Sequence, residues 1–381
     1  MEAHHLLVIT IIIISNHLIN IATTVKPTTL VKVADSLRLS NPDGRRADFF
    51  ASTVAMNKKF VAVGSFRDDV GGLTDVGSVS VFRAGDGALV QKLVPSDGTE
   101  YDYFGLSIAF GVDTLAVGSL QDLGGIPSRG CVYFYTLNAN RTSWTFLQKV
   151  KAAESSTSKQ FGISVAVRGD MAVVGGSKRF AVIHVLHFNG TAWTHRQLLT
   201  TSETSADNTY GTTVAIGGMT WIGLGLSYVA LGDRGYAGMV CLYHKVGGVW
   251  QQHTVLTSRS PAANGWYGRS ISMTDRQLVV GAEGEDGNRG RAYVYNFNPN
   301  MTPRGGEWRL ESILKPSHAN SYHFGFSLSL YHRSLLVGVF RKRNGTHEGK
   351  NFSGSFHSHF LGISHKNGRK NGREKLLGAL F

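Results

Sequence analysis

The chain is poor in the residues that mark helical, disulfide-bonded or disordered proteins. Charged residues make up 17% of its 381 residues, proline occurs 8 times and cysteine only twice. Two cysteines cannot build the disulfide framework of a small secreted fold, so Cys131 and Cys241 are either buried free thiols or one bridge between touching strands. No stretch has a sustained helical period. Glycine, in contrast, occurs 46 times, and this composition favours many short strands joined by glycine turns.

Long hydrophobic runs are also missing. The apolar run Leu6–Ile14 has nine residues, whereas a membrane-spanning helix needs about 20. Its length suits the core of a signal peptide, although no lysine or arginine precedes it. We therefore predict that residues 1–24 are a signal peptide or an N-terminal anchor, and that the protein is secreted or on the cell surface. Five glycosylation sequons agree with export: Asn140, Asn189, Asn300, Asn344 and Asn351.

The net charge of +13 is uneven along the chain, because residues 341–375 hold nine basic and two acidic residues. The segment 361–381 is predicted to be a basic tail. Such a tail is either simply solvated or attracted to an anionic glycan or membrane surface. Nucleic acid is not expected as a partner of an exported chain.

An internal repeat is the strongest signal in the sequence. An aromatic residue followed by glycine recurs in repeats starting near residues 104, 161, 210, 267 and 324, with a degenerate copy, Phe50-Ala51, near residue 50. A second glycine ends an apolar run 14 residues later in five of the six copies. In the fourth copy the corresponding distance to Gly232 is 22, which predicts an eight-residue insertion near residues 217–224.

Each copy contains four short segments with strand-like composition, which in the second copy are FGLSIAF, TLAVGS, GCVYFY and WTFLQKV. Six such units of about 50 to 57 residues predict an all-β fold, a β-propeller of about six four-stranded blades over residues 30–360, with seven as the alternative. The segment 30–39 resembles a fourth strand, and the sixth copy lacks one. We therefore predict that the N-terminal strand closes the ring.

These landmarks resemble a known family. Phe104-Gly105 followed by Val117-Gly118-Ser119, with its counterparts in the other copies, resembles the FG-GAP repeat of integrin alpha chains. The strings beginning at Phe161 and Tyr267 are similar to a compact variety of the repeat in large surface proteins. The resemblance implies a propeller and, in some members, a calcium loop between the first two strands. Here that turn has one acid, such as Asp113, too few oxygen ligands for calcium.

Acidic residues gather instead between the second and third strands of the repeats. They are either solvated turn residues or ligands of a divalent cation, and no other cofactor is predicted. Motifs such as His-Glu-x-x-His, Gly-x-Ser-x-Gly and the phosphate-binding loop are absent. The residues considered for a cation are Asp68, Asp69, Asp75, Glu283, Glu285 and Asp286.

Strand parity predicts that the sequons Asn140, Asn189 and Asn300 share one face and that the acidic loops lie on the other. We therefore expect an extracellular recognition or adhesion module, not an enzyme, that binds a protein or glycan through the unglycosylated face. Its predicted contacts are Arg67, Asp68, Asp69, Asp122, Arg234, Tyr236, Trp266, Glu283 and Asp286.

Two alternatives stay open at this point. One is an enzyme acting on polysaccharide from the same face, which carboxylates or histidines with perturbed pKa values around a central pocket would favour. The other is a fragment of a larger surface protein.

Overall fold

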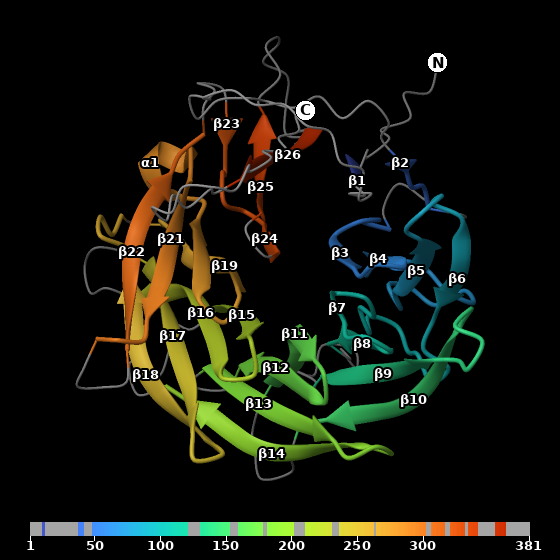
Figure 1. Ribbon diagram of the computed structural model, residues 1–381. Helices are drawn as coiled ribbons and strands as arrows, with labels where there is room; N and C mark the ends of the chain where they lie inside the picture. Colours follow the sequence, from blue (N-terminus) through green and yellow to red (C-terminus); the bar gives the residue numbers. More distant parts are fainter. Residues whose placement is uncertain are drawn as a thin grey trace, which may run out of the picture.

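A computed structural model shows a ring of six antiparallel sheets around a central axis (Figure 1). The structure describes residues 10–11, 37–41, 48–120, 130–152, 159–177, 181–201, 210–230, 236–262, 264–301, 306–316, 321–331, 334–341 and 355–362. The prediction of a propeller with about six blades is confirmed.

The strands follow the four segments of each repeat, and in the first five sheets consecutive strands are neighbours. In the last sheet β23 and β24 both pair with β25. The first sheet contains β3 (Thr53–Met56), β4 (Phe60–Ser65), β5 (Ser78–Arg83) and β6 (Leu89–Leu93). The second contains β7 (Ser107–Phe110), β8 (Thr114–Ser119), β9 (Cys131–Leu137) and β10 (Trp144–Lys151). The third contains β11 (Lys159–Arg168), β12 (Met171–Ser177), β13 (Ala181–Phe188) and β14 (Trp193–Thr200).

The remaining sheets complete the ring. The fourth contains β15 (Tyr210–Gly217), β16 (Trp221–Ala230), β17 (Tyr236–Val246) and β18 (Val249–Thr257). The fifth contains β19 (Tyr267–Met273), β20 (Gln277–Ala282), the short turn α1 (Glu285–Asn288), β21 (Arg291–Asn298) and β22 (Glu307–Leu314). The last contains β23 (Ser321–Tyr322), β24 (Leu328–Tyr331), β25 (Ser334–Arg341) and β26 (Ser355–Gly362).

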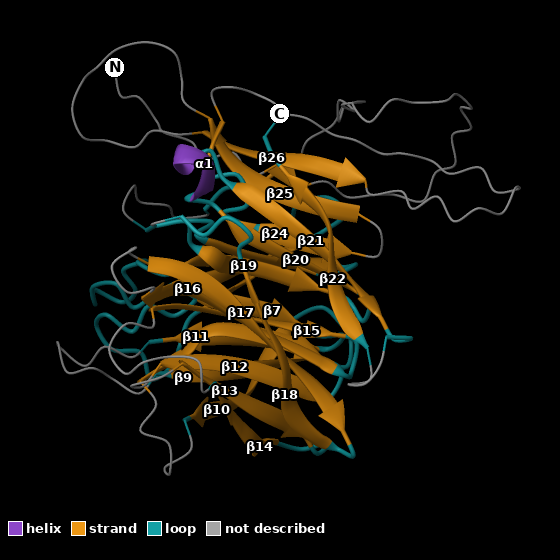
Figure 2. Ribbon diagram, turned by 90° about the vertical axis from the view of Figure 1, so that its left-hand side faces the viewer, coloured by secondary structure: helices purple, strands orange, loops and turns teal. Residues whose placement is uncertain are grey.

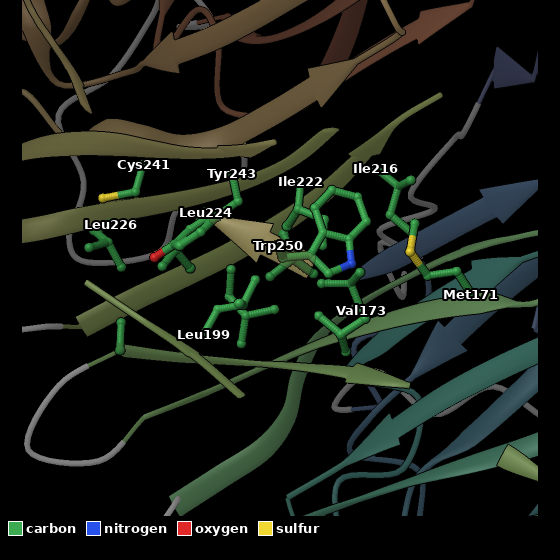
Figure 3. Close-up of a cluster of buried hydrophobic side chains, with 14 of the residues drawn as sticks. Met171, Val173, Leu199, Ile216, Ile222, Leu224, Leu226, Cys241, Tyr243 and Trp250 are labelled. Atoms are coloured by element: carbon green, nitrogen blue, oxygen red, sulfur yellow. The ribbon is translucent and has the colours of Figure 1, made fainter. Parts of the chain in front are cut away.

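Each sheet runs outward from the axis, with its first strand innermost (Figure 1). The second strand is the most buried, and β4 is buried along its whole length. The outer strands are less buried, and in β14 only Trp193 and Leu199 are buried among exposed and half-buried residues. Apolar side chains from neighbouring sheets fill the space between them. Figure 3 shows this for the third and fourth sheets, where Val173 and Leu199 share one cluster with Leu224 and Trp250.

Neighbouring sheets touch through glycine. A Cβ atom on Gly118 of β8 would lie 2.0 Å from the carbonyl oxygen of Gly162 in the next sheet. The hydroxyl of Ser107 donates a hydrogen bond of 2.7 Å to that same oxygen. Any side chain at residue 118 would therefore push the two sheets apart. The first sheet repeats the contact, with Thr53 donating to Gly105 at 2.6 Å.

The same contact corrects the alignment of the fourth repeat. Thr213 donates to the carbonyl oxygen of Gly268 at 2.9 Å, and a Cβ on Gly225 would lie 2.1 Å from that oxygen. Gly225 pairs with Thr213 as Gly118 pairs with Ser107. The landmark glycine is therefore Gly225 and not Gly232, which lies outside the described residues. The predicted eight-residue insertion is wrong, because the first turn of this repeat is only one residue longer.

At the outer rim, glutamines connect one sheet to the next. The side-chain amide of Gln91 donates to the carbonyl of Trp144 at 3.1 Å, and the Trp144 amide donates back at 2.8 Å. Gln148 and Trp193 form the same pair of hydrogen bonds between the second and third sheets. Trp144 and Trp193, which begin β10 and β14, therefore join sheets as well as filling the core.

The predicted closure of the ring differs from the structure. Within the described residues, the N-terminal segment contributes β2 (Leu37–Arg38), which pairs with β1 (Thr10–Ile11) and not with the last sheet. The last sheet instead gains β26, which pairs with β25. Ser355–Gly362 therefore supplies a third strand. The prediction that the N-terminal segment adds a fourth strand to the last sheet is wrong for the described residues of that segment.

Both cysteines are buried free thiols, so the alternative of a bridge between them is not realised. Burial is the main cause that raises the pKa of Cys131 to about 12. The described residues include no helix that is long and apolar enough to cross a membrane.

The corrected alignment predicts that Gly225→Ala destabilises the ring. The new Cβ would overlap a backbone carbonyl of the fifth sheet, and overpacking of this kind costs about 1–3 kcal/mol. Gly85→Ala is the matched control, because no atom lies within 4 Å of a Cβ at that position. Urea unfolding should show a loss of about 2 kcal/mol for Gly225→Ala and less than about 0.5 kcal/mol for the control. Equal stabilities would contradict the alignment.

Candidate functional site

Sheet topology puts the acidic loops and the sequons on opposite faces. The first and third turns of each sheet lie at one end of the strands, and the second turns and sheet-to-sheet connections lie at the other. Figure 2 shows α1, which belongs to the β20–β21 loop, at one end of the strands. Asn140, Asn189 and Asn300 are exposed in third turns. Their glycosylation stays a prediction, and Asn344 and Asn351 lie outside the described residues.

Glu283 is the most unusual residue on the loop face. It follows β20 and is only 2% exposed. One carboxylate oxygen, Oε1, lies 2.6 Å from Nε of Arg269. The other, Oε2, accepts no hydrogen bond from the described residues and lies 3.7 Å from Nδ1 of His323. Burial outweighs the attraction of Arg269 and raises the pKa of Glu283 to about 7.

The backbone around Glu283 is held by close contacts between two connections. A Cβ on Gly284 would lie 1.8 Å from the carbonyl oxygen of Asn264, so only glycine fits after Glu283. The last sheet also docks onto this loop, because the amide of His323 donates to the carbonyl of Asn288 at 2.8 Å. The imidazole and the carboxylate are therefore brought together by backbone hydrogen bonds, although they lie 40 residues apart in the sequence.

Aromatic rings and a guanidinium surround this pair. The rings of Trp266 and His323 are nearly parallel, with centroids 6.3 Å apart. The guanidinium carbon of Arg269 lies 5.9 Å from the centroid of Trp266 and 5.5 Å from that of Phe326. Burial first, and then the charge of Arg269, lower the pKa of His323. The site thus combines an imidazole whose pKa is lowered, a carboxyl whose pKa is raised and the guanidinium of Arg269.

Glu285 has a different, structural environment. It is 1% exposed, and its Oε2 accepts a hydrogen bond of 2.5 Å from the hydroxyl of Tyr293. A guanidinium nitrogen of Arg291 lies 3.7 Å away. Burial is the main cause that raises the pKa of Glu285. Its carbonyl also accepts from the amide of Gly290, which directly precedes β21, so Glu285 fixes the loop.

Asp68 occupies the corresponding place in the first sheet. Its carboxylate accepts a hydrogen bond of 2.5 Å from Ser78 and lies 2.6 Å from Nζ of Lys92. Its carbonyl accepts from Gly77, as that of Glu285 accepts from Gly290. Asp68 was predicted as a surface contact, but it is 5% exposed and closes a turn.

The acids considered for a divalent cation do not converge. Among the described residues, no group of three histidine, cysteine, aspartate or glutamate side chains could hold a metal ion. Asp68, Glu283 and Glu285 each face a basic side chain instead. Asp286 is exposed and lies 3.8 Å from Arg291, and Asp75 lies 4.0 Å from Arg67.

The remaining predicted contacts divide into two groups. Arg67 and Asp69 are exposed on the loop between β4 and β5, and Asp69 accepts a hydrogen bond of 3.0 Å from the backbone of Asp75. Asp122 and Arg234 lie outside the described residues, and only the backbone of Tyr236 is described. The structure thus brings Trp266 and Glu283 together, whereas Arg67 and Asp69 belong to another sheet.

Sequence reasoning missed Arg269 and His323. Neither belongs to a local motif, and each is placed by its position in a repeat. The signal that could have found the site is an acid at an apolar position. Two residues after the landmark glycine of the second strand, the first and second repeats have Phe66 and Leu120, and the fifth has Glu283.

The fold and the repeated sheet contacts define a β-propeller built from one supersecondary unit. The model of the FG-GAP repeat matches residues 35–82, 88–135, 144–179 and 250–295. The chain therefore contains FG-GAP repeats, and these repeats fit the compact variety. No curated protein matches the sequence.

Two solved structures are similar to this chain. The periplasmic gluconolactonase of Pseudomonas aeruginosa is 13% identical with a TM-score of 0.47, over 77% of this chain and 89% of that one. A protein from Bacteroides uniformis assigned as a 6-phosphogluconolactonase is 13% identical with a TM-score of 0.52, over 81% of this chain and 83% of that one. At this identity the likeness concerns the fold.

These findings correct the predicted function. A recognition or adhesion module without enzymatic activity was expected, but the Bacteroides uniformis structure with this fold is assigned as an enzyme. Carboxylates with perturbed pKa values were expected to favour the enzymatic alternative, and Glu283 is a buried carboxyl whose pKa is raised.

The pKa of Glu283 predicts how stability depends on pH. A carboxyl whose pKa is about 7 when folded and 4.5 when unfolded stabilises the fold fully below about pH 4.5, and this contribution is lost as pH rises through about 7. Relative to Glu283→Gln, the wild type should lose about 3 kcal/mol between pH 4.5 and 8. Glu307→Gln, at an exposed carboxylate of β22, is the control. Urea unfolding at both pH values measures the difference, and parallel behaviour of Glu283→Gln and wild type would contradict the assignment.

Proposed function

We propose that this protein is a hydrolase of a sugar-derived ester or lactone, with Glu283 as the group that transfers the proton. The observation that carries the proposal is the pKa of about 7 for the buried Glu283 carboxyl, beside Arg269 and His323. A general base works best when its pKa is near the operating pH. Asp68, on the same face, also lies against a cation, Lys92, but its carboxylate accepts a hydrogen bond from Ser78 as well. Oε2 of Glu283, in contrast, accepts none from the described residues.

The chemistry needs one base and a cation. Glu283 takes a proton from a water molecule whose oxygen attacks the carbonyl carbon of the ester. Negative charge then develops on the carbonyl oxygen, and a fixed guanidinium such as Arg269 stabilises it. When the bond between the carbonyl carbon and the leaving oxygen breaks, that oxygen receives the proton from Glu283. The carboxyl returns to its starting state, and no other reactant is required.

Cleavage of a glycosidic bond is less well supported. Most glycoside hydrolases place two carboxyl groups on either side of the scissile bond. Here the second nearby carboxyl, Glu285, accepts a hydrogen bond from Tyr293 and faces Arg291. The environment therefore favours ester or lactone hydrolysis over the polysaccharide cleavage considered from sequence.

We also propose that the enzyme acts outside the cell. The apolar run Leu6–Ile14 and the sequons support this location. Glycans on Asn140, Asn189 and Asn300 would cover the face opposite Glu283 and leave the loop face open to substrate.

Activity on glucono-1,5-lactone tests the proposal, because structures of the same fold carry gluconolactonase names. The secreted wild type should hydrolyse this lactone, or a sugar ester such as acetylated glucose, faster than the spontaneous rate. Since the base must be deprotonated, kcat/KM should rise with pH through about 7. Glu283→Gln should lower kcat by about 10²–10⁴, and Glu307→Gln should not change it.

Turnover no faster than the spontaneous reaction on these compounds would reject the proposal. An active Glu283→Gln variant, shown to be folded by circular dichroism, would reject the role of Glu283.

A further inference from the structure

The junction of the first and second sheets repeats the geometry of the Glu283 site with different side chains. In both places, three equivalent repeat positions come together. The first directly precedes the aromatic residue that opens a repeat, and the second lies two residues after the landmark glycine of that repeat. The third directly precedes the aromatic residue that opens the next repeat. The main chain is held alike, since Tyr103 donates to Asp75 at 3.2 Å as His323 donates to Asn288. The two sets are Trp266, Glu283 and His323 at one junction, and Phe49, Phe66 and Tyr103 at the other.

The second set forms an aromatic cluster on the loop face, which we call the aromatic platform: Phe49, Phe66, Tyr101 and Tyr103. Ring centroids are 5.4 Å apart for Phe49 and Phe66, 5.9 Å for Phe66 and Tyr103, and 6.4 Å for Tyr101 and Tyr103. Phe49 is 55% exposed and Tyr101 is 37% exposed. A contiguous aromatic surface of this kind marks an interaction site more often than a scattered apolar residue does.

The backbone holds these rings at the surface at a cost. Phe49, Tyr101 and Tyr103 have φ values of 52°, 64° and 51°, in the left-handed region that bulky residues rarely adopt. Strain of this kind concentrates at functional sites.

A charged group lies against the platform. The guanidinium carbon of Arg67 is 5.2 Å from the centroid of Phe49 and 5.7 Å from that of Phe66. Its Nε lies 4.0 Å from a carboxylate oxygen of Asp75, and Asp69 is exposed on the same loop. The platform thus presents an apolar surface with hydrogen-bonding groups close by.

We propose that the aromatic platform is a subsite for a sugar ring of the substrate that does not react. A pyranose has a face of C–H groups, which packs on aromatic rings, and a rim of hydroxyls, which hydrogen-bonds to groups such as Arg67 and Asp69. The inference rests on the proposed function, because it makes the substrate of the Glu283 site an oligosaccharide derivative and not a free monosaccharide. Both sites lie on the same face, because both are built from second turns and sheet-to-sheet connections.

The charged groups around the platform and its small extent favour a sugar over a lipid surface or an apolar protein partner. A lipid surface or an apolar protein partner would be expected to contact a wider patch without Arg67, Asp69 and Asp75 around it. These two occupants are outcomes that the experiment separates from the carbohydrate.

Direct binding tests the subsite without requiring turnover. Isothermal titration of the full chain with cellotetraose, maltotetraose and chitotetraose should detect at least one ligand. The double variant Phe49→Ala with Tyr101→Ala should weaken its binding at least tenfold. Phe146→Ala is the matched control, because Phe146 is a 51% exposed aromatic on the outer strand β10. It should bind within twofold of wild type.

Other outcomes separate this inference from the proposed function. In one outcome, Glu283→Gln still binds the tetrasaccharide, the platform variant does not, and no lactone or ester is turned over. This result would support the subsite and reject the hydrolase. Turnover without tetrasaccharide binding, or binding unchanged in the platform variant, would overturn the subsite. Platform-dependent sedimentation with phosphatidylcholine vesicles, and no tetrasaccharide binding, would assign the platform to a lipid surface and also overturn it.

Discussion

The ring depends on how closely one sheet can approach the next. At four of the junctions a glycine of the second strand lies against the carbonyl of another glycine in the following sheet, and a serine or threonine hydroxyl donates to that carbonyl. The hydroxyl satisfies a buried acceptor that would otherwise be costly, and the missing Cβ sets the spacing. Because the contact recurs from sheet to sheet, the twist between sheets accumulates into a closed ring and not an open stack.

This contact also explains why the fold could be read from the sequence. Glycine is irreplaceable where a Cβ would lie about 2 Å from a carbonyl oxygen, as at Gly64, Gly118 and Gly281, so it recurs at a fixed spacing. The one misread repeat shows the limit of spacing alone. Gly225 and Gly232 both end apolar runs, and only the partner of Thr213 in three dimensions tells them apart. Closure of the ring escaped prediction for a similar reason, because several segments had strand-like composition and pairing is a long-range choice.

The site was less predictable than the fold. Glu283 was selected from sequence, but as one of several acids in loops. Glu283 differs from the other acids because it is buried and lies beside Arg269 and His323. These two residues belong to two different sheets, and their positions in the repeats bring them close to Glu283. Asp68 looked equivalent in sequence and proves to be a turn-closing residue beside Lys92. Local sequence shows where carboxylates are, whereas desolvation and charge pairing decide which carboxylates have unusual chemistry.

A repeat protein separates these two tasks by position. The glycines, the innermost aromatics and the donating hydroxyls are fixed by the approach of the sheets, so little variation is tolerated there. Two other positions of the repeat take no part in that contact: the residue before each aromatic and the second residue after each landmark glycine. The same backbone nevertheless places both positions on one face, around the axis. They are free to hold Trp266 and Glu283 at one junction and Phe49 and Phe66 at another. A carboxyl with perturbed pKa therefore arises without disturbing the ring, since its neighbours are held by the backbone of two sheets and not by the carboxyl itself.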